Sequence, residues 1–177
     1  MKAIVLVAHP DDCAIFAWPF IEAYPEFKWD IVYLTYTPWE PRAREATAFW
    51  DTKNINTIFL GYRDEWESVK DGNLGFDAEQ AERELSNIAG EYDLILTHFE
   101  DGDYGHIHHK FVHNAVEDHT NVITFSESGQ NSVTYSVPPE QYSLNELPLH
   151  ADVIKIFHND SHSRSYNIPT HLLDKGN

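Results

Sequence analysis

Short apolar runs alternate with amphipathic segments over the first two thirds of the chain. Five runs have the length and the β-branched and aromatic content of buried strands, and they lie at 2–8, 29–37, 55–62, 92–99 and 121–128. Four segments between them repeat apolar residues at helical spacing, at 11–24, 40–53, 77–89 and 106–119. This alternation predicts an α/β fold: a single Rossmann-like domain with a mainly parallel sheet and helices on both faces.

The pattern weakens toward the end of the chain. Residues 133–139 fit an edge strand, 144–158 contain a helical pattern near their end, and 161–177 show no clear period. A chain of 177 residues usually forms one domain. We therefore expect a single domain over residues 1–177, with a motif-bearing core at about 1–130.

The charge of the chain is strongly acidic, which restricts its partners. Lysine and arginine together number 12 against 29 acidic residues, for a net charge of −17. Such a surface disfavours broad contact with nucleic acid phosphates or anionic membranes, and no apolar stretch is long enough to span a bilayer. We therefore expect no nucleic acid partner and no membrane insertion. Since the N-terminus has no signal-peptide pattern, we also expect a cytoplasmic location.

Histidines and carboxylates gather after two of the predicted strands. The first apolar run is followed by His9, Asp11 and Asp12, and the fourth leads into the sequence GHIHH at 105–109. Because the carboxyl ends of parallel strands meet at one edge of a sheet, we expect both motifs to lie together there. Adjacent aspartates repel each other unless a cation or a proton shares the site.

A divalent metal explains this combination. Zinc in hydrolytic sites takes three nitrogen or oxygen ligands and leaves one position for water. One carboxylate of the pair could bind the metal while its neighbour takes a proton from water. An HPDD sequence on its own is typical of a solvated helix start. Its combination with the histidine motif at one rim favours the metal site.

Helical spacing gives the clustered histidines different directions. His106, His109 and His113 share one helical face, whereas His108 points elsewhere. We interpret His113, one turn beyond His109, as a helix-face residue without a ligand role. The single cysteine, Cys13, excludes an internal disulfide and a cysteine-based zinc finger.

Four segments together resemble one protein family. The sequence AHPDD after the first strand, and YGHIHH about a hundred residues later, are similar to the two metal-site motifs of the PIG-L/LmbE family of zinc-dependent N-acetylglucosaminyl deacetylases. The sequences RAREA and FLGYRDE between them resemble its Arg-x-x-Glu helix and its Leu-Gly-Tyr-x-Asp turn. The resemblance covers residues 1 to about 116 well and the C-terminal third poorly.

The resemblance implies a metal-dependent N-deacetylase. Its substrate would be a small N-acetyl amino sugar or glycoconjugate, from which it hydrolyses the acetyl (acyl) group. The resemblance implies one Zn²⁺ ion, with other divalent metals as alternatives, held by His9, Asp12 and His109. Asp11 would be the general base toward the attacking water. His106 would stabilise the oxyanion or protonate the leaving amine.

Three further residues have two interpretations each. Arg42 could form only an i,i+3 surface pair with Glu45, and Asp64 could be an ordinary turn residue. The resemblance makes Arg42 and Asp64 candidate substrate-binding residues. Trp39, just past the second strand, belongs to the core or rim, or could stack on a sugar.

Two positions depart from the family pattern. Cys13 stands where the family usually has Glu after the aspartates, and His108 stands where many members carry Asp. These changes leave open an alternative: a catalytically silent member of the same fold that binds metal and sugar. A nucleotide-binding domain is a weaker alternative than either of these interpretations, because no GxGxxG turn follows the first strand. The chain is short for the family, so a homo-oligomer could complete an open pocket.

Overall fold

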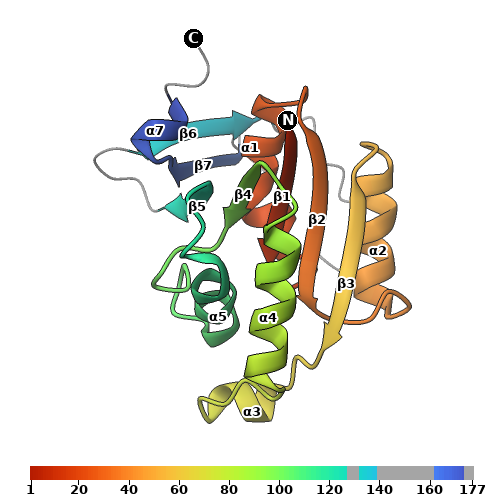
Figure 1. Cartoon of the computed structure of the whole chain (residues 1–177). Helices are drawn as coiled ribbons and strands as arrows, with labels where there is room; N and C mark the ends of the chain where they lie inside the picture. Colours follow the sequence, from red (N-terminus) through yellow and green to blue (C-terminus); the bar gives the residue numbers. More distant parts are fainter. Residues whose placement is uncertain (127–131, 139–161, 174–177) are drawn as a thin grey trace.

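A sheet of mainly parallel strands organises the molecule (Figure 1). The computed structural model describes residues 1–126, 132–138 and 162–173, and within them seven strands pair in the order β3-β2-β1-β4-β5-β7-β6. These strands are β1 (Lys2–Val7), β2 (Lys28–Thr35), β3 (Asn56–Tyr62), β4 (Leu94–Thr97), β5 (Val122–Ser126), β6 (Ser132–Val137) and β7 (His162–Asn167). The first five pair in parallel, and β7 runs antiparallel to both β5 and β6. The predicted α/β fold is confirmed.

Helices cover both faces of the sheet. One face carries α1 (Trp18–Ala23) and α2 (Pro41–Asp51), and the other carries α4 (Ala78–Ala89) and α5 (Ile107–Val116). Two short helices, α3 (Trp66–Lys70) and α7 (Thr170–Leu173), lie outside these layers. No helix among the described residues is long and apolar enough to cross a membrane.

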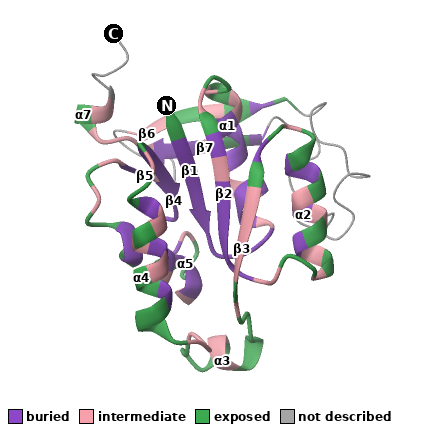
Figure 2. Ribbon diagram, turned by 45° about the vertical axis from the view of Figure 1, so that its right-hand side comes forward, coloured by how far each residue is buried: buried purple, intermediate pink, exposed green. Residues whose placement is uncertain are grey.

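Strand β1 is the centre of the core, as its burial in Figure 2 shows. Ala3, Val5 and Val7 pack into the core on the α1 and α2 side, and Ile4 and Leu6 into the core on the α4 and α5 side. Both faces of β1 are therefore apolar, which is why its sequence is a continuous apolar run rather than an alternating one.

The strand order reverses between β1 and β4. From β1 the chain proceeds outward to β2 and β3, and it then returns to place β4 on the other side of β1. In open α/β sheets this reversal opens a crevice at the carboxyl ends of the two strands. The segments after β1 and β4, which begin at Ala8 and His98, therefore lie side by side at this edge.

The helix predicted over residues 11–24 is divided into two parts. A π-helical turn, Cys13–Ala17, precedes α1. Pro19 explains the interruption, because proline has no N–H to donate to the carbonyl four residues earlier, which belongs to Ile15. His162 Nε2 and Arg164 Nε from β7 donate to that Ile15 carbonyl instead, at 2.6 and 2.9 Å.

Residues 161–177, which show no clear sequence period, contain β7 and α7. Strand β7 was not predicted, because its polar side chains are bound to the carbonyls of the π-helical turn rather than to solvent. The edge strand predicted at 133–139 is confirmed as β6, at the end of the sheet. The helix predicted within 144–158 lies outside the described residues.

The contact between β7 and the π-helical turn gives a stability prediction. The Tyr166 hydroxyl donates to the Phe16 carbonyl at 2.7 Å and is buried. Tyr166→Phe leaves that carbonyl without this donor, so the free energy of unfolding in urea should fall by about 1 kcal/mol. Tyr104→Phe, at an exposed ring, is the control and should change it by less than about 0.5 kcal/mol. Equal effects would contradict the assigned contact.

Candidate functional site

The end of β1 is fixed by hydrogen bonds from both neighbouring strands. The Ala8 carbonyl accepts from the Thr35 amide at 3.0 Å and from the Thr35 hydroxyl at 2.7 Å. The Ala8 amide donates to His98 Nε2 at 3.0 Å. Since these groups are buried, the chain has little freedom where it leaves the sheet. His9 therefore enters the crevice from a rigid position.

The segment from His9 to Asp12 forms a closed turn. The Asp12 amide donates to the His9 carbonyl at 3.1 Å, and the His9 amide donates to Asp12 Oδ2 at 2.7 Å. Pro10 between them has a restricted φ, which favours such a turn. The turn directs His9 and Asp12 to the same point, with His9 Nδ1 lying 3.2 Å from Asp12 Oδ2.

Asp103 connects the segment after β4 to helix α5. Its Oδ2 lies 2.5 Å from His98 Nδ1 and 2.8 Å from His109 Nδ1, and its Oδ1 accepts from the Phe99 amide at 3.2 Å. Three acidic residues, Glu100, Asp101 and Asp103, precede the histidine motif, and the sequence gives no means of choosing among them. The signal that could have selected Asp103 is its place in a glycine-flanked loop between two histidines.

Hydrogen bonding fixes where His98 and His109 carry their protons. The Ala8 amide donates to His98 Nε2, so the proton of a neutral His98 is on Nδ1 and is donated to Asp103. Burial lowers the pKa of His98, which keeps the ring neutral. His109 likewise donates its Nδ1 proton to Asp103 and turns Nε2 toward Asp12 at 3.3 Å.

A second chain of hydrogen bonds orders His9 through His108. His108 Nε2 donates to the Leu74 carbonyl at 2.9 Å, because a carbonyl only accepts. Burial lowers the pKa of His108, so its Nδ1 has no proton and accepts from His9 Nε2 at 3.2 Å. The remaining nitrogen of His9, Nδ1, then presents a lone pair to Asp12. His108 thus fixes the tautomer of His9 although it departs from the family motif.

Three lone-pair atoms converge as a result. His9 Nδ1, Asp12 Oδ2 and His109 Nε2 are separated by 3.2, 3.3 and 3.3 Å. Ligands of a tetrahedral zinc ion, at bond lengths of about 2.0–2.1 Å, lie about 3.3–3.4 Å apart. The three residues therefore fit a metal ion in the type and the spacing of their donor atoms. The other ring nitrogen of each histidine is held by a hydrogen bond, as is usual for metal-binding histidines.

The electrostatics of this cluster favour positive charge at its centre. Burial lowers the pKa of His109, but Asp12 and Asp103 outweigh it and raise that pKa to about 10. Burial raises the pKa of Asp12, but His109 and His9 hold it well below its usual value. A proton or a metal cation can occupy the lone pair of His109, and the two compete for it.

Three other combinations of these residues also bring candidate ligand atoms together, and two of them include a nitrogen that already accepts a hydrogen bond. Within the described residues, His9, His106 and His109 form one alternative group, and Asp12, His98 and His109 form another. His98 Nε2 already accepts the Ala8 amide. A third group comprises His9, Asp64 and His108, but His108 Nδ1 already accepts from His9.

The inner pocket is a cavity of about 240 Å³ beside the converging atoms, and it collects the remaining predicted residues. It is lined by His9, Asp11, Arg42, Asp64, Trp66, Val69, Tyr104 and His106. Arg42 Nη2 lies 3.1 Å from Asp11 Oδ2, so Arg42 is not merely a surface partner of Glu45. The Tyr36 hydroxyl accepts from Arg42 at 3.4 Å and donates to Asp64 at 3.3 Å. Sequence reasoning had not selected Tyr36.

His106 is the N-cap residue of α5 and faces the inner pocket. Its Nδ1 accepts from the His108 amide at 3.1 Å, so the proton of the neutral ring is on Nε2. Burial, together with His9 and the neighbouring histidines, lowers the pKa of His106 to about 4. The ring is therefore a neutral hydrogen-bond donor in this structure.

Two residues lie apart from the converging atoms. Cys13 is buried in the core, and burial raises the pKa of its thiol well above the usual value. It belongs to none of the candidate ligand groups in the described part of the chain. His113 Nδ1 donates to the His98 carbonyl at 2.9 Å, in keeping with a helix-face residue that has no ligand role.

Comparison with known proteins decides the family. A family model, PIG-L, described as GlcNAc-PI de-N-acetylase, matches residues 4–120. The chain belongs to the PIG-L family. The predicted resemblance is confirmed, and PIG-L membership supports a hydrolytic deacetylase. No curated protein sequence gives a match.

Solved structures share the PIG-L fold at low sequence identity. A deacetylase–bog complex from the biosynthesis pathway of teicoplanin has a TM-score of 0.61 and 11% identity, over 96% of this chain and 99% of that chain. A deacetylase–teicoplanin complex has a TM-score of 0.58 and 12% identity, over 94% and 97%. The zinc-inhibited form of teicoplanin deacetylase Orf2 has a TM-score of 0.55 and 12% identity, over 94% and 97%. At these identities the likeness concerns the fold.

The loop that carries Asp103 gives one prediction. A Cβ at Gly102, where φ is +77°, would lie 2.6 Å from the His106 carbonyl oxygen, whereas one at Gly72, where φ is +79°, meets no atom within 4 Å. Both alanine substitutions should lower the free energy of unfolding by about 1–2 kcal/mol, because a residue with a Cβ is strained at a positive φ. Gly102→Ala should lower the free energy of unfolding in urea further, because the loop must also shift. Equal losses of stability in the two variants would show that the contact with the His106 carbonyl does not contribute.

The role of His108 gives a second prediction. His108→Phe keeps a ring but removes the acceptor for His9, so the affinity for Zn²⁺ should fall about 10- to 100-fold in a chelator-competition titration. His108→Asp restores an acceptor and should remain within a few-fold of the unmodified protein. If both variants bind Zn²⁺ equally well, His108 does not order His9. Long-range ¹H–¹⁵N spectra report the tautomer directly.

Proposed function

We propose that this chain is a zinc-dependent N-deacetylase of an N-acetyl amino sugar or glycoconjugate. The observation that carries the proposal is the convergence of His9, Asp12 and His109 at mutual distances of 3.2–3.3 Å beside the inner pocket. Membership of the PIG-L family supports the same reaction. A metal bound there would act as a Lewis acid and lower the pKa of water for attack on the amide carbonyl.

Asp11 is proposed as the general base. It is adjacent to Asp12 in sequence but lines the inner pocket, where Arg42 holds one of its oxygens at 3.1 Å. Two neighbouring carboxylates thereby take different roles: Asp12 binds the metal, and Asp11 accepts the proton of the attacking water. The Arg42 contact orients Asp11 toward the cavity and limits its rotamers.

His106 is proposed to stabilise the oxyanion. Because its Nδ1 accepts the His108 amide, its Nε2–H is the group available to the inner pocket. Such a donor can hydrogen-bond to the oxygen on which negative charge develops. Since the neutral ring carries only this proton, we assign His106 the oxyanion role rather than protonation of the amine. The departing amine can take the proton that Asp11 accepts from the attacking water.

The substrate class follows from the family and the pocket. The family model refers to GlcNAc-PI, and one structural relative was solved with teicoplanin, which supports a glycoconjugate. Arg42 and Asp64 line the inner pocket and share Tyr36. We propose that they bind the hydroxyl groups of the sugar. Since Arg and Asp offer a donor and an acceptor respectively, they suit a polyhydroxylated ring.

Metal analysis and substitutions test this proposal. Protein purified without added metal should contain about one divalent ion per chain, and His9→Ala, Asp12→Ala or His109→Ala should lose it. His113→Ala, one helical turn from His109, is the matched control and should retain the metal. Asp11→Asn should retain the metal but lose hydrolysis of N-acetyl sugars by about 10²- to 10⁴-fold.

Two results would count against the proposal. A protein with no affinity for divalent metals would exclude the mechanism. A protein that binds metal and sugar but releases no acetate from a panel of N-acetyl sugars would instead be the catalytically silent member that Cys13 and His108 leave as an alternative.

A further inference from the structure

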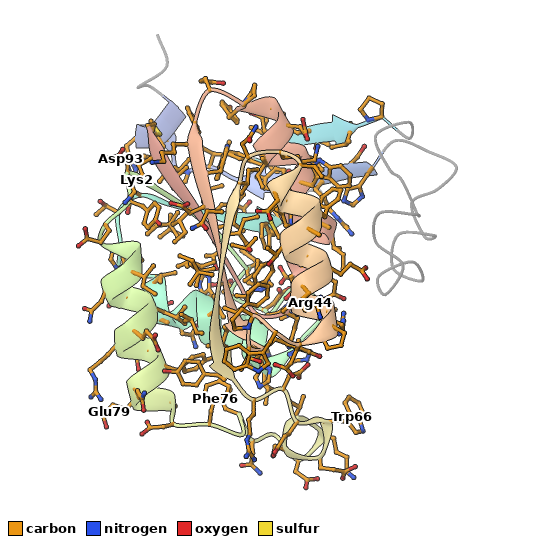
Figure 3. The ribbon with its side chains drawn as sticks, turned by 90° about the vertical axis from the view of Figure 1, so that its right-hand side faces the viewer. Lys2, Arg44, Trp66, Phe76, Glu79 and Asp93 are labelled. Atoms are coloured by element: carbon orange, nitrogen blue, oxygen red, sulfur yellow. The ribbon has the colours of Figure 1, made fainter. Side chains whose placement is uncertain are left out.

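The exposed aromatic side chains of this molecule gather beside the proposed catalytic site. Four large hydrophobic side chains are exposed in the described part of the chain: Met1, Trp39 (73%), Trp66 (71%) and Tyr104 (68%). Trp66 and Tyr104 line the inner pocket, and Figure 3 shows Trp66 projecting outward from α3. Exposed large apolar surface that is grouped in this way marks a site of interaction.

Trp39 lines a second cavity that adjoins the first. This outer groove, of about 570 Å³, lies between the segments after β2 and β3 and is lined by Tyr36, Trp39, Glu40, Tyr62, Arg63 and Glu65, among others. Asp64 lines both cavities, so they adjoin at this residue. The inner pocket alone is below the range of about 300–1,000 Å³ that is typical of ligand sites. A ligand that also fills the outer groove brings the site into that range.

The outer groove combines aromatic rings with negative charge. Three carboxylates, Glu40, Asp64 and Glu65, face one guanidinium, that of Arg63. Arg63 is paired with Glu65 at 2.8 Å, and carboxylates outnumber cations among the described residues of the lining. Such a lining disfavours phosphate and carboxylate ligands and accepts neutral or cationic ones.

We propose that the outer groove binds an uncharged, aromatic or apolar aglycone of the substrate, with Trp39 as its stacking platform. The proposal rests on the proposed function and specifies its substrate class: N-acyl glycosides whose sugar occupies the inner pocket and whose aglycone carries no phosphate. Trp39, which is exposed, supplies a flat apolar face in the lining of the groove. Trp66 contacts the part of the ligand nearer to the amide.

Binding of deacetylated products tests this without any turnover. Phenyl and methyl β-glucosaminides carry no amide, and they differ only in the aglycone. The phenyl compound should bind about 3- to 10-fold more tightly by calorimetry. It should also protect tryptophan fluorescence from acrylamide. Trp39 and Trp66 dominate this quenching, because Trp18, Trp29 and Trp50 are buried.

Substitution of Trp39 separates stacking from a general effect. Trp39→Ala should bring the ratio of phenyl to methyl affinity close to one and leave the methyl affinity unchanged, and Trp39→Phe should restore the preference. Equal affinity for the two glucosaminides in the unmodified protein, failure of either to bind, or a preference that survives in Trp39→Ala would overturn the proposal.

The charge of the groove is tested with an anionic probe. 4-Carboxyphenyl β-glucosaminide should bind more weakly than the phenyl compound, and Glu65→Gln should improve its binding about two- to fivefold by removing one negative charge. Glu79→Gln is the matched control. It also removes a carboxylate paired with an arginine, Arg83 at 2.6 Å, but on α4, where Figure 3 shows Glu79 pointing away from the fold. An equal gain in both variants would exclude a charge effect specific to the groove.

The outcomes also distinguish this inference from the proposed function. If the protein hydrolyses N-acetyl sugars but shows no dependence on Trp39, the aglycone proposal fails and the deacetylase stands. If it binds phenyl glucosaminide through Trp39 but hydrolyses no amide, the groove stands and the reaction fails.

Discussion

The Asp103 carboxylate is the interaction on which the candidate site depends. It binds two histidines that come from different elements: His98 from the end of β4 and His109 from α5. His98 in turn fixes the end of β1 through Ala8. One buried carboxylate thus joins a central strand, a loop and a helix. Because each of these bonds also determines a tautomer, Asp103 controls the direction of the lone pairs as well as the position of the rings.

The two histidines of the converging set are ordered by different chemistry. His109 donates to a carboxylate, whereas His9 donates to another imidazole, which is itself anchored on a backbone carbonyl. The carboxylate adds negative charge to the site, and the imidazole adds none. An Asp at position 108 would add a further charge beside Asp64, whose Oδ1 lies 3.8 Å from His108 Nδ1. The histidine found here keeps the orienting hydrogen bond and avoids that repulsion.

The fold and the meeting of the two motifs could be predicted from sequence because both follow from short-range patterns and from the rules of parallel sheets. Asp103 could not be chosen, since its loop requires a left-handed residue at a φ of 66° and nearby glycines, which are set by tertiary contacts. Strand β7 was missed because its polar residues bind backbone carbonyls distant in sequence. The single domain over 1–177, the homo-oligomer and the cytoplasmic location remain predictions.

Pro19 connects the π-helical turn Cys13–Ala17 to a part of the chain beyond the region matched by the family model. Pro19 cannot donate to the Ile15 carbonyl, and that carbonyl accepts from His162 and Arg164. A chain with another residue at position 19 could complete its own helix and would have no use for those donors. A substitution at position 19 would therefore act on β7, a strand that lies far later in the chain but binds the carbonyl that Pro19 cannot reach.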